Sequence, residues 1–421
     1  MASLQPVRGT HDLLPEDIRR HRRVVECARQ IAERYGYQEM ATPIFEFTEV
    51  FRRTLGETSD VVTKEMYTFA DRGGDEITLR PEYTASIARA FISGGLRRHA
   101  PLKLFASGPM FRYERPQKGR LRQFHQIDAE VIGVAGPQAD IEIIELGAHI
   151  LQGLGVAELC TLELNTLGDS ESRATYRKLL VDYFESHRSD LSEDSKLRLD
   201  KNPLRILDSK DDGDRKLIVG APRGSDSLTS EAADFFASVR DGLDQLAIAY
   251  TINEKLVRGL DYYTHTAFEF TTEALGAQGT VIGGGRYDGL IEMMGGSPTP
   301  GIGFAGGIER LAMLASEVPA EVRPVAVIPI GKSTQAAALR VCHQLRHAGF
   351  AADLGFSGNL SKRMARANKL NASCAVIIGD DELAKDAVSV RDFDSGKQEE
   401  VALSSIIAVL NRYHPDGAAS A

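Results

Sequence analysis

The chain has 421 residues and 43% hydrophobic content, which predicts two to three globular domains, and no apolar run approaches the ~20 residues of a membrane span. Its N-terminus lacks the features of a signal peptide and its four cysteines lack C-x-x-C spacing, so we expect a reducing, cytoplasmic setting without disulfides or a metal site formed by a side-chain cluster. The net charge is −9, but 12 Lys and Arg face 10 Asp and Glu from Arg323 onward, so the total neither supports nor excludes a nucleic-acid partner.

Residues 1–168 alternate between helical and strand patterns and are expected to form the first part of a domain. Tyr35–Glu46 joins a helix to a strand, and Pro43 suits the start or edge of that strand. Further on, the strand-like E-I-T-L leads into R-P-E-Y-T, residues 80–84. Glu82 and Thr84 would bring a carboxylate and a hydroxyl to the end of that strand, where an ammonium group could be held.

The segment F-R-Y-E-R-P-Q-K-G-R-L-R-Q-F-H-Q, from Phe111 to Gln126, predicts a β-hairpin with a basic tip. A strand-like lead-in reaches Arg112, a Pro-Gln-Lys-Gly tip turns the chain, and alternating residues return along the second strand. A solvated basic hairpin is the ordinary interpretation of such a charge run. The alternative is a loop that meets polyphosphate and nucleic acid.

Residues 169–246 differ in character and are expected to form a helical insertion. The stretches 172–185 and 228–243 have helical spacing and few β-branched residues, and a charged segment lies between them. Strand patterning resumes with A-I-A-Y-T-I-N, so 247–314 is expected to complete the domain that 1–168 began.

The most informative stretch is E-K-L-V-R-G-L-D-Y-Y, residues 254–263. We predict a strand or strand entry for E-K-L-V and a half-buried strand for the T-A-F-E-F that follows. Between them stand Arg258, Tyr262 and Tyr263. A guanidinium beside two phenols suits a site that binds an anion together with a planar polar ligand, and a packed strand–loop corner is the ordinary alternative.

Gly301–Leu311, G-I-G-F-A-G-G-I-E-R-L, is predicted as a glycine-rich strand that leads directly into a helix carrying Arg310. The letters also satisfy G-x-G-x-x-G, the dinucleotide-binding fingerprint. That fingerprint needs an apolar strand before it, whereas the lead-in here is G-G-S-P-T-P, and no strand ending in an acid follows ~20 residues later. We therefore reject a dinucleotide fold.

The last part of the chain is predicted to be a separate α/β domain at 323–421, joined by a linker at 315–322. Its strands and helices alternate in a β-α-β-α-β order, with helices expected at about 333–347, 360–370 and 403–413. Composition alone fits a generic flavodoxin-like domain equally well.

In this order, the segments resemble the class II aminoacyl-tRNA synthetases and, within them, the histidyl-tRNA synthetase family. The similarity runs almost end to end, from R-G-T-H-D (Arg8–Asp12) and the dimer motif (Tyr35–Glu46) to motif 3 at 301–310. R-G-L-D-Y-Y and G-G-G-R-Y-D-G (Gly283–Gly289) match two histidine-specific signatures. The resemblance implies an α+β fold with an antiparallel catalytic sheet flanked by helices, a helical insertion, and a C-terminal α/β anticodon-binding domain.

The implied activity is that of a histidine–tRNA ligase, which forms histidyl-adenylate from L-histidine and ATP, releases pyrophosphate and transfers histidine to the 3′ end of tRNA(His). Two anions must approach in the first step, so fixed cations supply much of the catalysis. By resemblance, Arg112 holds the α-phosphate and the histidine carboxylate, Arg310 holds the γ-phosphate, and Arg258 faces the α-phosphate from the opposite side. Glu114 would join Arg112 and Arg310 in binding ATP, and Mg²⁺ would bridge its β- and γ-phosphates.

Recognition of histidine needs a carboxylate for the ammonium group and polar partners for both ring nitrogens. The family pattern places Glu82 and Thr84 at the amino group, and Glu130 and Tyr263 at the imidazole. Tyr83 stands where that pattern has glycine, so its phenol must either point away from the pocket or help to form it. The full expected histidine-binding set is Glu82, Tyr83, Thr84, Arg112, Gln126, Glu130, Arg258, Tyr262, Tyr263 and Tyr287.

The resemblance also implies two macromolecular partners, tRNA(His) and a second copy of the chain. Tyr35–Glu46 would pack against its two-fold mate in a homodimer. Lys362, Arg366 and Lys369 share one face of a predicted helix, which either contacts the anticodon arm or is merely solvated. The expected tRNA-binding residues are Gln117, Lys118, Arg120 and Arg122 in the hairpin and Lys362, Arg363, Arg366 and Lys369 in the last domain.

The sequence leaves three alternatives to compare with this interpretation. The regulatory subunit of ATP phosphoribosyltransferase is a non-catalytic paralogue that typically lacks the anticodon module and complete signatures. This chain has Arg112, Arg258 and Arg310, an intact R-G-L-D-Y-Y and a C-terminal α/β domain, all of which favour the enzyme. A class II synthetase for another amino acid fails on the two histidine signatures. Within G-G-G-R-Y-D-G, a tight turn with purely structural Arg286 and Asp288 fits as well as a pocket loop.

Overall fold

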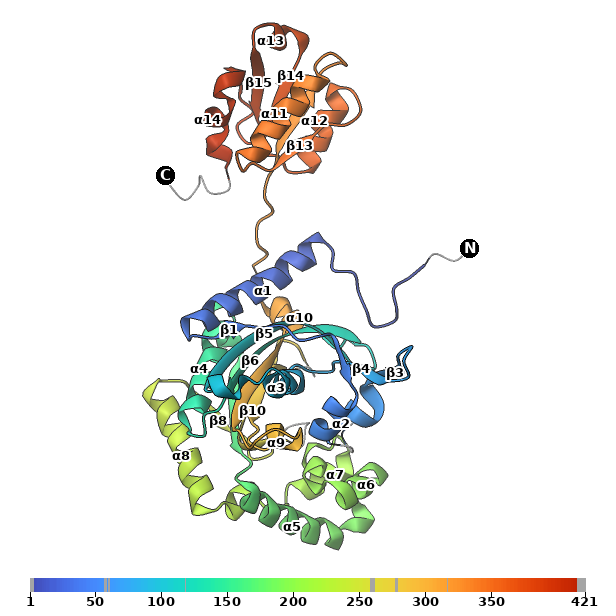
Figure 1. Cartoon of the computed structure of the whole chain (residues 1–421), viewed down its shortest axis with the longest axis vertical. Helices are drawn as coiled ribbons and strands as arrows, with labels where there is room; N and C mark the ends of the chain where they lie inside the picture. Colours follow the sequence, from blue (N-terminus) through green and yellow to red (C-terminus); the bar gives the residue numbers. More distant parts are fainter. Residues whose placement is uncertain are drawn as a thin grey trace. The chain divides into compact units, whose positions relative to one another are not determined.

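The computed structural model describes residues 4–56, 59, 61–117, 119–257, 262–276, 279–315 and 317–414. The chain divides into two compact units, Met1–Pro319 and Ala320–Ala421, and each has its own sheet and core (Figure 1). Two predicted site residues, Lys118 and Arg258, lie outside the described residues. Within the described ranges, no helix is long and apolar enough to cross a membrane.

The larger unit is built on an eight-stranded sheet in the order β1-β5-β6-β11-β10-β9-β7-β8. The six inner strands run antiparallel, and the two-residue edge strands β1 and β8 pair in parallel with their neighbours. This architecture confirms the predicted α+β fold. The strands are β1 (Gln38–Glu39), β5 (Leu102–Phe111), β6 (Gln123–Ile132), β7 (Thr161–Thr166), β8 (Thr251–Ile252), β9 (Thr264–Thr271), β10 (Thr280–Arg286) and β11 (Gly301–Gly307).

Four helices share a hydrophobic core with one face of this sheet. Successive side chains of a strand point to opposite faces, and in β6 the odd-numbered Ile127, Ala129 and Val131 belong to this core. The even-numbered residues of β6 are therefore directed to the other face. The helices are α1 (Pro15–Arg34), α4 (Gln138–Gly153), α8 (Ser230–Gln245) and α10 (Ile308–Leu314).

A second core lies on the other face of the sheet, where Leu104, Ala106 and Met110 of β5 pack with residues of α2, α3 and α9. A small antiparallel sheet in the order β2-β4-β3 adjoins these helices, and its strand β4 confirms the prediction made from E-I-T-L. The elements are β2 (Phe45–Phe47), α2 (Glu49–Leu55), β3 (Tyr67–Ala70), β4 (Glu76–Leu79), α3 (Thr84–Ser93) and α9 (Leu290–Met293).

The helical stretch after β7 has a core of its own, formed by residues that include Leu180, Phe184 and Leu199. Its helices are α5 (Ser170–Ser186), α6 (Glu193–Lys201) and α7 (Asp212–Ile218). Helix α8 instead packs with the core of the large sheet. The strand predicted for E-K-L-V is wrong, because β8 ends at Ile252 and the Asn165 side chain donates hydrogen bonds to the carbonyls of Glu254 and Leu256.

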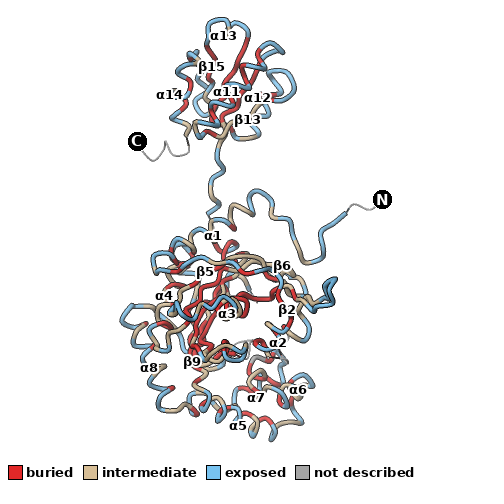
Figure 2. The backbone as a smooth tube through the Cα atoms, in the orientation of Figure 1, coloured by how far each residue is buried: buried red, intermediate tan, exposed pale blue. Residues whose placement is uncertain are grey.

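The smaller unit has a five-stranded sheet in the order β13-β12-β14-β15-β16, with the first three strands parallel and the last two antiparallel. Every residue of β12 and β14 is buried, as in a sheet covered on both faces (Figure 2). The helix predicted at about 403–413 is interrupted by 3₁₀ turns on both sides of α14. The elements are β12 (Val325–Pro329), α11 (Gln335–His347), β13 (Ala352–Leu354), α12 (Leu360–Lys369), β14 (Cys374–Ile378), α13 (Asp380–Ala384), β15 (Ala387–Asp392), β16 (Gln398–Ala402) and α14 (Ile406–Leu410).

Candidate active site

One cavity of the larger unit, with a volume of about 230 Å³, collects most of the side chains that the sequence singled out. Its walls come from the start of α3, the hairpin between β5 and β6, the segment after residue 261, and the β11–α10 junction. The predicted site residues that line it are Glu82, Thr84, Arg112, Glu114, Arg120, Gln126, Tyr262, Tyr263 and Arg310. Segments distant in the sequence therefore converge on one site.

Two arginines are fixed on the cavity wall by backbone carbonyls. Arg112 donates from Nε to the Pro81 carbonyl at 2.9 Å, and its guanidinium lies 5.2 Å from the centre of the Phe124 ring. Arg310 donates to the Thr280 carbonyl at 2.6 Å. Burial lowers the pKa of Arg310, and nearby Arg120 adds to that effect, yet a guanidinium keeps its charge at neutral pH. The cavity thus holds preorganised positive charge.

Glu130 is a buried carboxyl that is held on both oxygens. The Thr84 hydroxyl donates to Oε1 at 2.6 Å, and the Tyr287 hydroxyl donates to Oε2 at 2.5 Å. Burial raises the pKa of Glu130 to about 8, and these two hydrogen bonds, which favour the charged form, oppose that rise. Gly303 faces it from β11, and a Cβ there would stand 1.6 Å from Oε2, which explains the glycine in this strand.

Tyr287 and Glu130 lie behind the cavity wall rather than on it. Tyr262 connects them to the cavity, because its ring centre lies 4.5 Å from that of Tyr263 and 5.9 Å from that of Tyr287. The three phenols form an aromatic layer behind the wall that Tyr262 and Tyr263 line.

The Tyr83 side chain lies away from the cavity in which it was expected to bind histidine. Its side chain is buried in the second core, and its hydroxyl donates to the Ser107 carbonyl at 3.0 Å. The Arg80 guanidinium lies 4.0 Å from the Tyr83 ring centre. Gly108 makes room for both, since a Cβ there would stand 2.7 Å from Arg80 Nη2 and 3.0 Å from the Tyr83 hydroxyl. The phenol therefore points away from the cavity, the first of the two possibilities.

Asp128 is a buried carboxyl that the sequence reasoning did not single out, and it lies behind the cavity wall rather than on it. It lies between Gln126 and Glu130 on the same face of β6, and it is fully buried. Within the described residues, both of its carboxylate oxygens and the Gln126 Oε1 have no hydrogen-bond partner. Burial, with Glu130 and Glu82 nearby, raises the pKa of Asp128 well above its usual range. The alternation in Q-I-D-A-E was the signal that could have located it.

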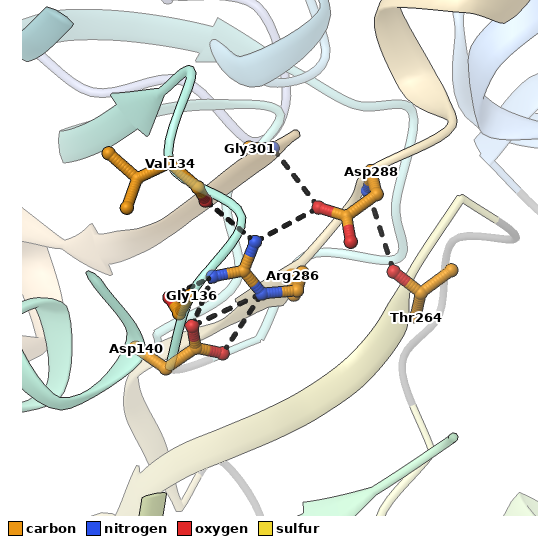
Figure 3. A network of polar contacts seen from close by, with 7 residues as sticks. All are labelled: Val134, Gly136, Asp140, Thr264, Arg286, Asp288 and Gly301. Carbon is orange, nitrogen blue, oxygen red and sulfur yellow. Dashed lines mark hydrogen bonds and ion pairs between the residues drawn. The ribbon is translucent and has the colours of Figure 1, made fainter. Parts of the chain in front are cut away.

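Arg286 and Asp288 of the G-G-G-R-Y-D-G signature belong to a network of structural contacts (Figure 3). Tyr287 between them donates to Glu130 instead. Arg286 is fully buried and pairs with Asp140 at the start of α4. Its remaining donors reach the carbonyls of Val134 and Gly136 and the Asp288 carboxylate, at 3.0–3.1 Å. The guanidinium thus joins β10 to α4 and to the loop that follows β6.

The basic hairpin is shorter as a strand pair than its alternation predicted, because β6 begins only at Gln123. Gln117 and Arg120 exchange backbone hydrogen bonds, and Gly119 takes the positive φ of 74° that this tight turn needs. The Arg122 guanidinium stacks 3.9 Å from the centre of the Tyr113 ring. Arg120 lines the cavity and pairs with Glu114 at 3.3 Å, so two of the predicted tRNA-binding side chains already have contacts within the hairpin region.

One of the residues predicted to contact tRNA in the smaller unit, Arg363, is buried. Arg363 is buried against β12 and donates to the Pro329 carbonyl, so its charge is not presented to a phosphate. Lys362, Arg366 and Lys369 are exposed on α12, and Arg366 pairs with Asp353 at 3.1 Å. Helix periodicity places Lys362, Arg366 and Lys369 on one face of α12 and Arg363 on another. The face with Arg363 packs against β12, and the other face is exposed to solvent.

Comparisons with known proteins agree with this geometry. The sequence profile of the histidyl-tRNA synthetase family matches residues 9–171 and 210–311, and that of an anticodon binding domain matches 324–413. The chain is 59% identical to the histidine–tRNA ligase of Rhodospirillum rubrum over 98% of this chain and 100% of that protein. It is 56% identical to the histidine–tRNA ligase of Gluconacetobacter diazotrophicus over 97% and 99% of the two chains.

Among solved structures, apo histidyl-tRNA synthetase from S. aureus is similar at 35% identity, with a TM-score of 0.82 over 97% of this chain and 99% of that one. The similarity extends over both units. On its cavity, its fold and these full-length similarities, the chain belongs to the histidyl-tRNA synthetase family.

Proposed function

We propose that the chain is a histidine–tRNA ligase that activates L-histidine with ATP and transfers it to tRNA(His). The observation that carries this proposal is the convergence of nine predicted site residues on one cavity, in a chain 59% identical to a histidine–tRNA ligase along its whole length. Such a ligase serves protein synthesis, which places it in the cytoplasm. The direct test is ATP–pyrophosphate exchange with each proteinogenic amino acid in turn, where histidine alone should support exchange.

The cavity supports the proposed roles in activation. Arg112 and Arg310 would bind the phosphates of ATP, because both guanidinium groups line the cavity and are held from behind by carbonyls. The role of Arg258 at the α-phosphate rests on the family resemblance, since this residue lies outside the described ranges. Glu114 and Glu269 also line the cavity and offer the oxygen ligands that Mg²⁺ prefers. When bound with ATP, Mg²⁺ would neutralise phosphate charge.

Histidine recognition would use the acceptors on the face of β6. An ammonium group brings three donors, and Gln126 and Asp128 offer buried acceptors without partners in the described structure. Glu82 is oriented by the Ala85 backbone N–H, which donates to Oε1 at 2.7 Å. We therefore add Asp128 to the residues proposed to recognise histidine. Glu130 and Tyr287 would act from behind the wall through Thr84 and Tyr262.

Replacing Glu130 should affect histidine more than ATP. Glu130→Ala leaves Thr84 and Tyr287 without their acceptor, and a buried group left unpaired costs about 1–3 kcal/mol, so the KM for histidine should rise by ~10-fold or more. The KM for ATP should stay nearly unchanged. Steady-state pyrophosphate exchange measures both constants, and an equal loss for both substrates would assign Glu130 a purely structural role.

The same carboxyl predicts a pH-dependent stability. Its folded-state pKa of about 8 is above the ordinary value of 4.5, so the folded chain binds this proton more tightly than the unfolded chain. The resulting stabilisation is complete below pH 4.5 and is lost as the pH rises through 8. Glu130→Gln, which is neutral at every pH, should lose less stability than the wild type over that rise. Urea unfolding on both sides of that pH measures the difference, and parallel pH profiles would contradict the prediction.

The smaller unit is proposed to bind the anticodon arm of tRNA(His), as expected for the anticodon binding domain that it matches. Removing residues 323–421 should leave histidyl-adenylate formation largely intact, because the catalytic cavity lies entirely within the larger unit. Charging of tRNA should weaken. If the truncated enzyme charged tRNA as efficiently as the full chain, the smaller unit would not be the anticodon reader.

A finer variant tests the basic face of α12 in the full chain. Neutralising Lys362, Arg366 and Lys369 to Gln should reduce tRNA affinity and flatten its salt dependence. With fewer phosphate contacts, binding releases fewer counterions from the tRNA. A matched control removes the same charge from three exposed lysines elsewhere in this unit and should change neither property. The control residues are Lys332, Lys385 and Lys397.

A homodimer is proposed from an exposed apolar surface on the small sheet. Ile44, Phe45 and Phe47 are 43%, 56% and 60% exposed in the single chain, and they lie in or beside the dimer motif. Large apolar side chains that cluster at a surface commonly mark an interface, and a two-fold contact would cover them on both copies. Sedimentation velocity should show twice the mass of the chain. A stable monomer at micromolar concentration, or a dimer insensitive to Phe45→Asp, would count against this interface.

A further inference from the structure

Two histidines and a glutamate meet in the larger unit where α1, β6 and α10 pack together. His21 comes from α1, His125 from β6 and Glu309 from α10, and their potential ligand atoms all lie within 4.8 Å of one another. No metal-ligand spacing in the sequence indicates this cluster, because its members are far apart along the chain and only the fold brings them together.

The geometry of the cluster is fixed from the backbone. The His125 backbone N–H donates to both oxygens of the Glu309 carboxylate at 3.0 Å, and its ring Nδ1 lies 2.8 Å from Oε1. The rings of His21 and His125 meet edge to face, with their centres 5.3 Å apart. A carboxylate oriented by a backbone donor resembles the outer-shell support that metal ligands receive in proteins.

The His21 ring is available to an ion. In the part of the chain that the structure describes, no hydrogen bond involves the His21 ring, so no donor competes for its lone pair.

The cluster is also open on one side. His21 and Glu309 line a cavity of about 810 Å³ whose other walls include Asp12, Asp17 and Gln117. Protein sites for zinc with three ligands commonly leave a fourth position to water or to a small molecule. Access from this cavity would let an ion reach the three side chains and complete its coordination with water.

We propose that His21, His125 and Glu309 form a binding site for one divalent transition-metal ion of the zinc type. Two imidazoles and a carboxylate suit Zn²⁺, Co²⁺ or Ni²⁺, whereas Mg²⁺ prefers oxygen ligands alone, so this site differs from the Mg²⁺ that accompanies ATP. A bound ion would join α1, β6 and α10. Because Glu309 also lines the catalytic cavity and precedes Arg310, the ion would stabilise the wall that holds that arginine.

The test uses the full-length chain in buffer with excess Mg²⁺, which occupies sites made of oxygen ligands only. Equilibrium dialysis should give one bound Zn²⁺ per chain, and titration with Co²⁺ should give the visible absorption of a protein-bound ion. His21→Gln should weaken Zn²⁺ binding at least ~10-fold, because even the loss of an outer-shell partner of a metal ligand has an effect of that size. His99→Gln, a matched change at an exposed histidine, should leave it unchanged.

Thermal unfolding separates the site from a structural effect. Without metal, His21→Gln should unfold near the wild-type temperature, and added Zn²⁺ should raise the Tm of the wild type but not of this variant. If His21→Gln fails to fold, His125→Gln takes its place in both measurements. No stoichiometric Zn²⁺ in the wild type, or binding that survives both substitutions, would overturn the proposal and leave the cluster as a hydrogen-bonded His–Glu pair.

Discussion

Arg112→Ala is expected to reduce histidine-dependent pyrophosphate exchange by about 10²–10³-fold, the scale of losing one preorganised electrostatic contact at a reacting centre. The Pro81 carbonyl and the Phe124 ring hold the guanidinium on the cavity wall, so its charge is already in place before substrates arrive. Two buried carboxyls, Glu82 and Asp128, lie near this guanidinium. Burial raises the pKa of both, and the positive charge of Arg112 opposes that rise. Without the cation, ATP and the histidine carboxylate would approach an acidic surface.

The controls for this variant separate charge from geometry. Arg112→Lys retains the positive charge but loses the planar fork that meets phosphate and carboxylate oxygens in pairs, so it should recover only part of the activity. Arg72→Ala, at an exposed position in the turn between β3 and β4, should behave as the wild type. Pyrophosphate exchange within a few-fold of normal in Arg112→Ala, with unchanged thermal unfolding, would remove this residue from the activation step.

Local patterns predicted the elements that carry the cavity. The glycine-rich run at 301–307 forms β11 and continues directly into α10, as its composition indicated. The reason for one of those glycines appeared only in the structure, because the Glu130 carboxyl occupies the space where a side chain of residue 303 would lie. A sequence shows that a strand lacks side chains, but it does not show which side chain from another strand fills the gap.

Burial of charged residues was the least predictable property. Arg363 and Arg366 are three positions apart on one helix, yet Arg363 donates to a carbonyl of β12 while Arg366 is exposed. Periodicity gave their relative directions but not which direction faces the sheet. The turn at 254–257 was missed for a similar reason, since a side chain from β7, Asn165, satisfies its backbone carbonyls. Contacts between distant segments decide these outcomes.

Tyr83 and Asp128 are two residues near the cavity whose surroundings depend on contacts between distant segments. The Tyr83 ring packs under Arg80 and over Gly108, at a position where the family pattern has glycine. Burial raises the pKa of Tyr83, and Asp128, on the neighbouring strand β6, adds to that effect. The first is packed away from the cavity and the second is left with unpaired oxygens. Neither consequence was visible in the local sequence.

Asp140→Ala is expected to destabilise the larger unit by about 3–5 kcal/mol, because it leaves Arg286 buried without its main counter-charge. The guanidinium and the carboxylate are both fully inaccessible to solvent, so water cannot replace the lost partner. The exposed pair between Glu193 and Lys196 is the matched control, and Glu193→Ala should leave the free energy of unfolding almost unchanged. Equilibrium unfolding in urea measures both variants. Replacing both buried partners, as in Asp140→Leu with Arg286→Met, should cost less than Asp140→Ala alone, since no charge is then stranded. A loss below 1 kcal/mol in Asp140→Ala would show that Asp288 and the carbonyls of Val134 and Gly136 suffice to hold Arg286, and that the ion pair with α4 is dispensable.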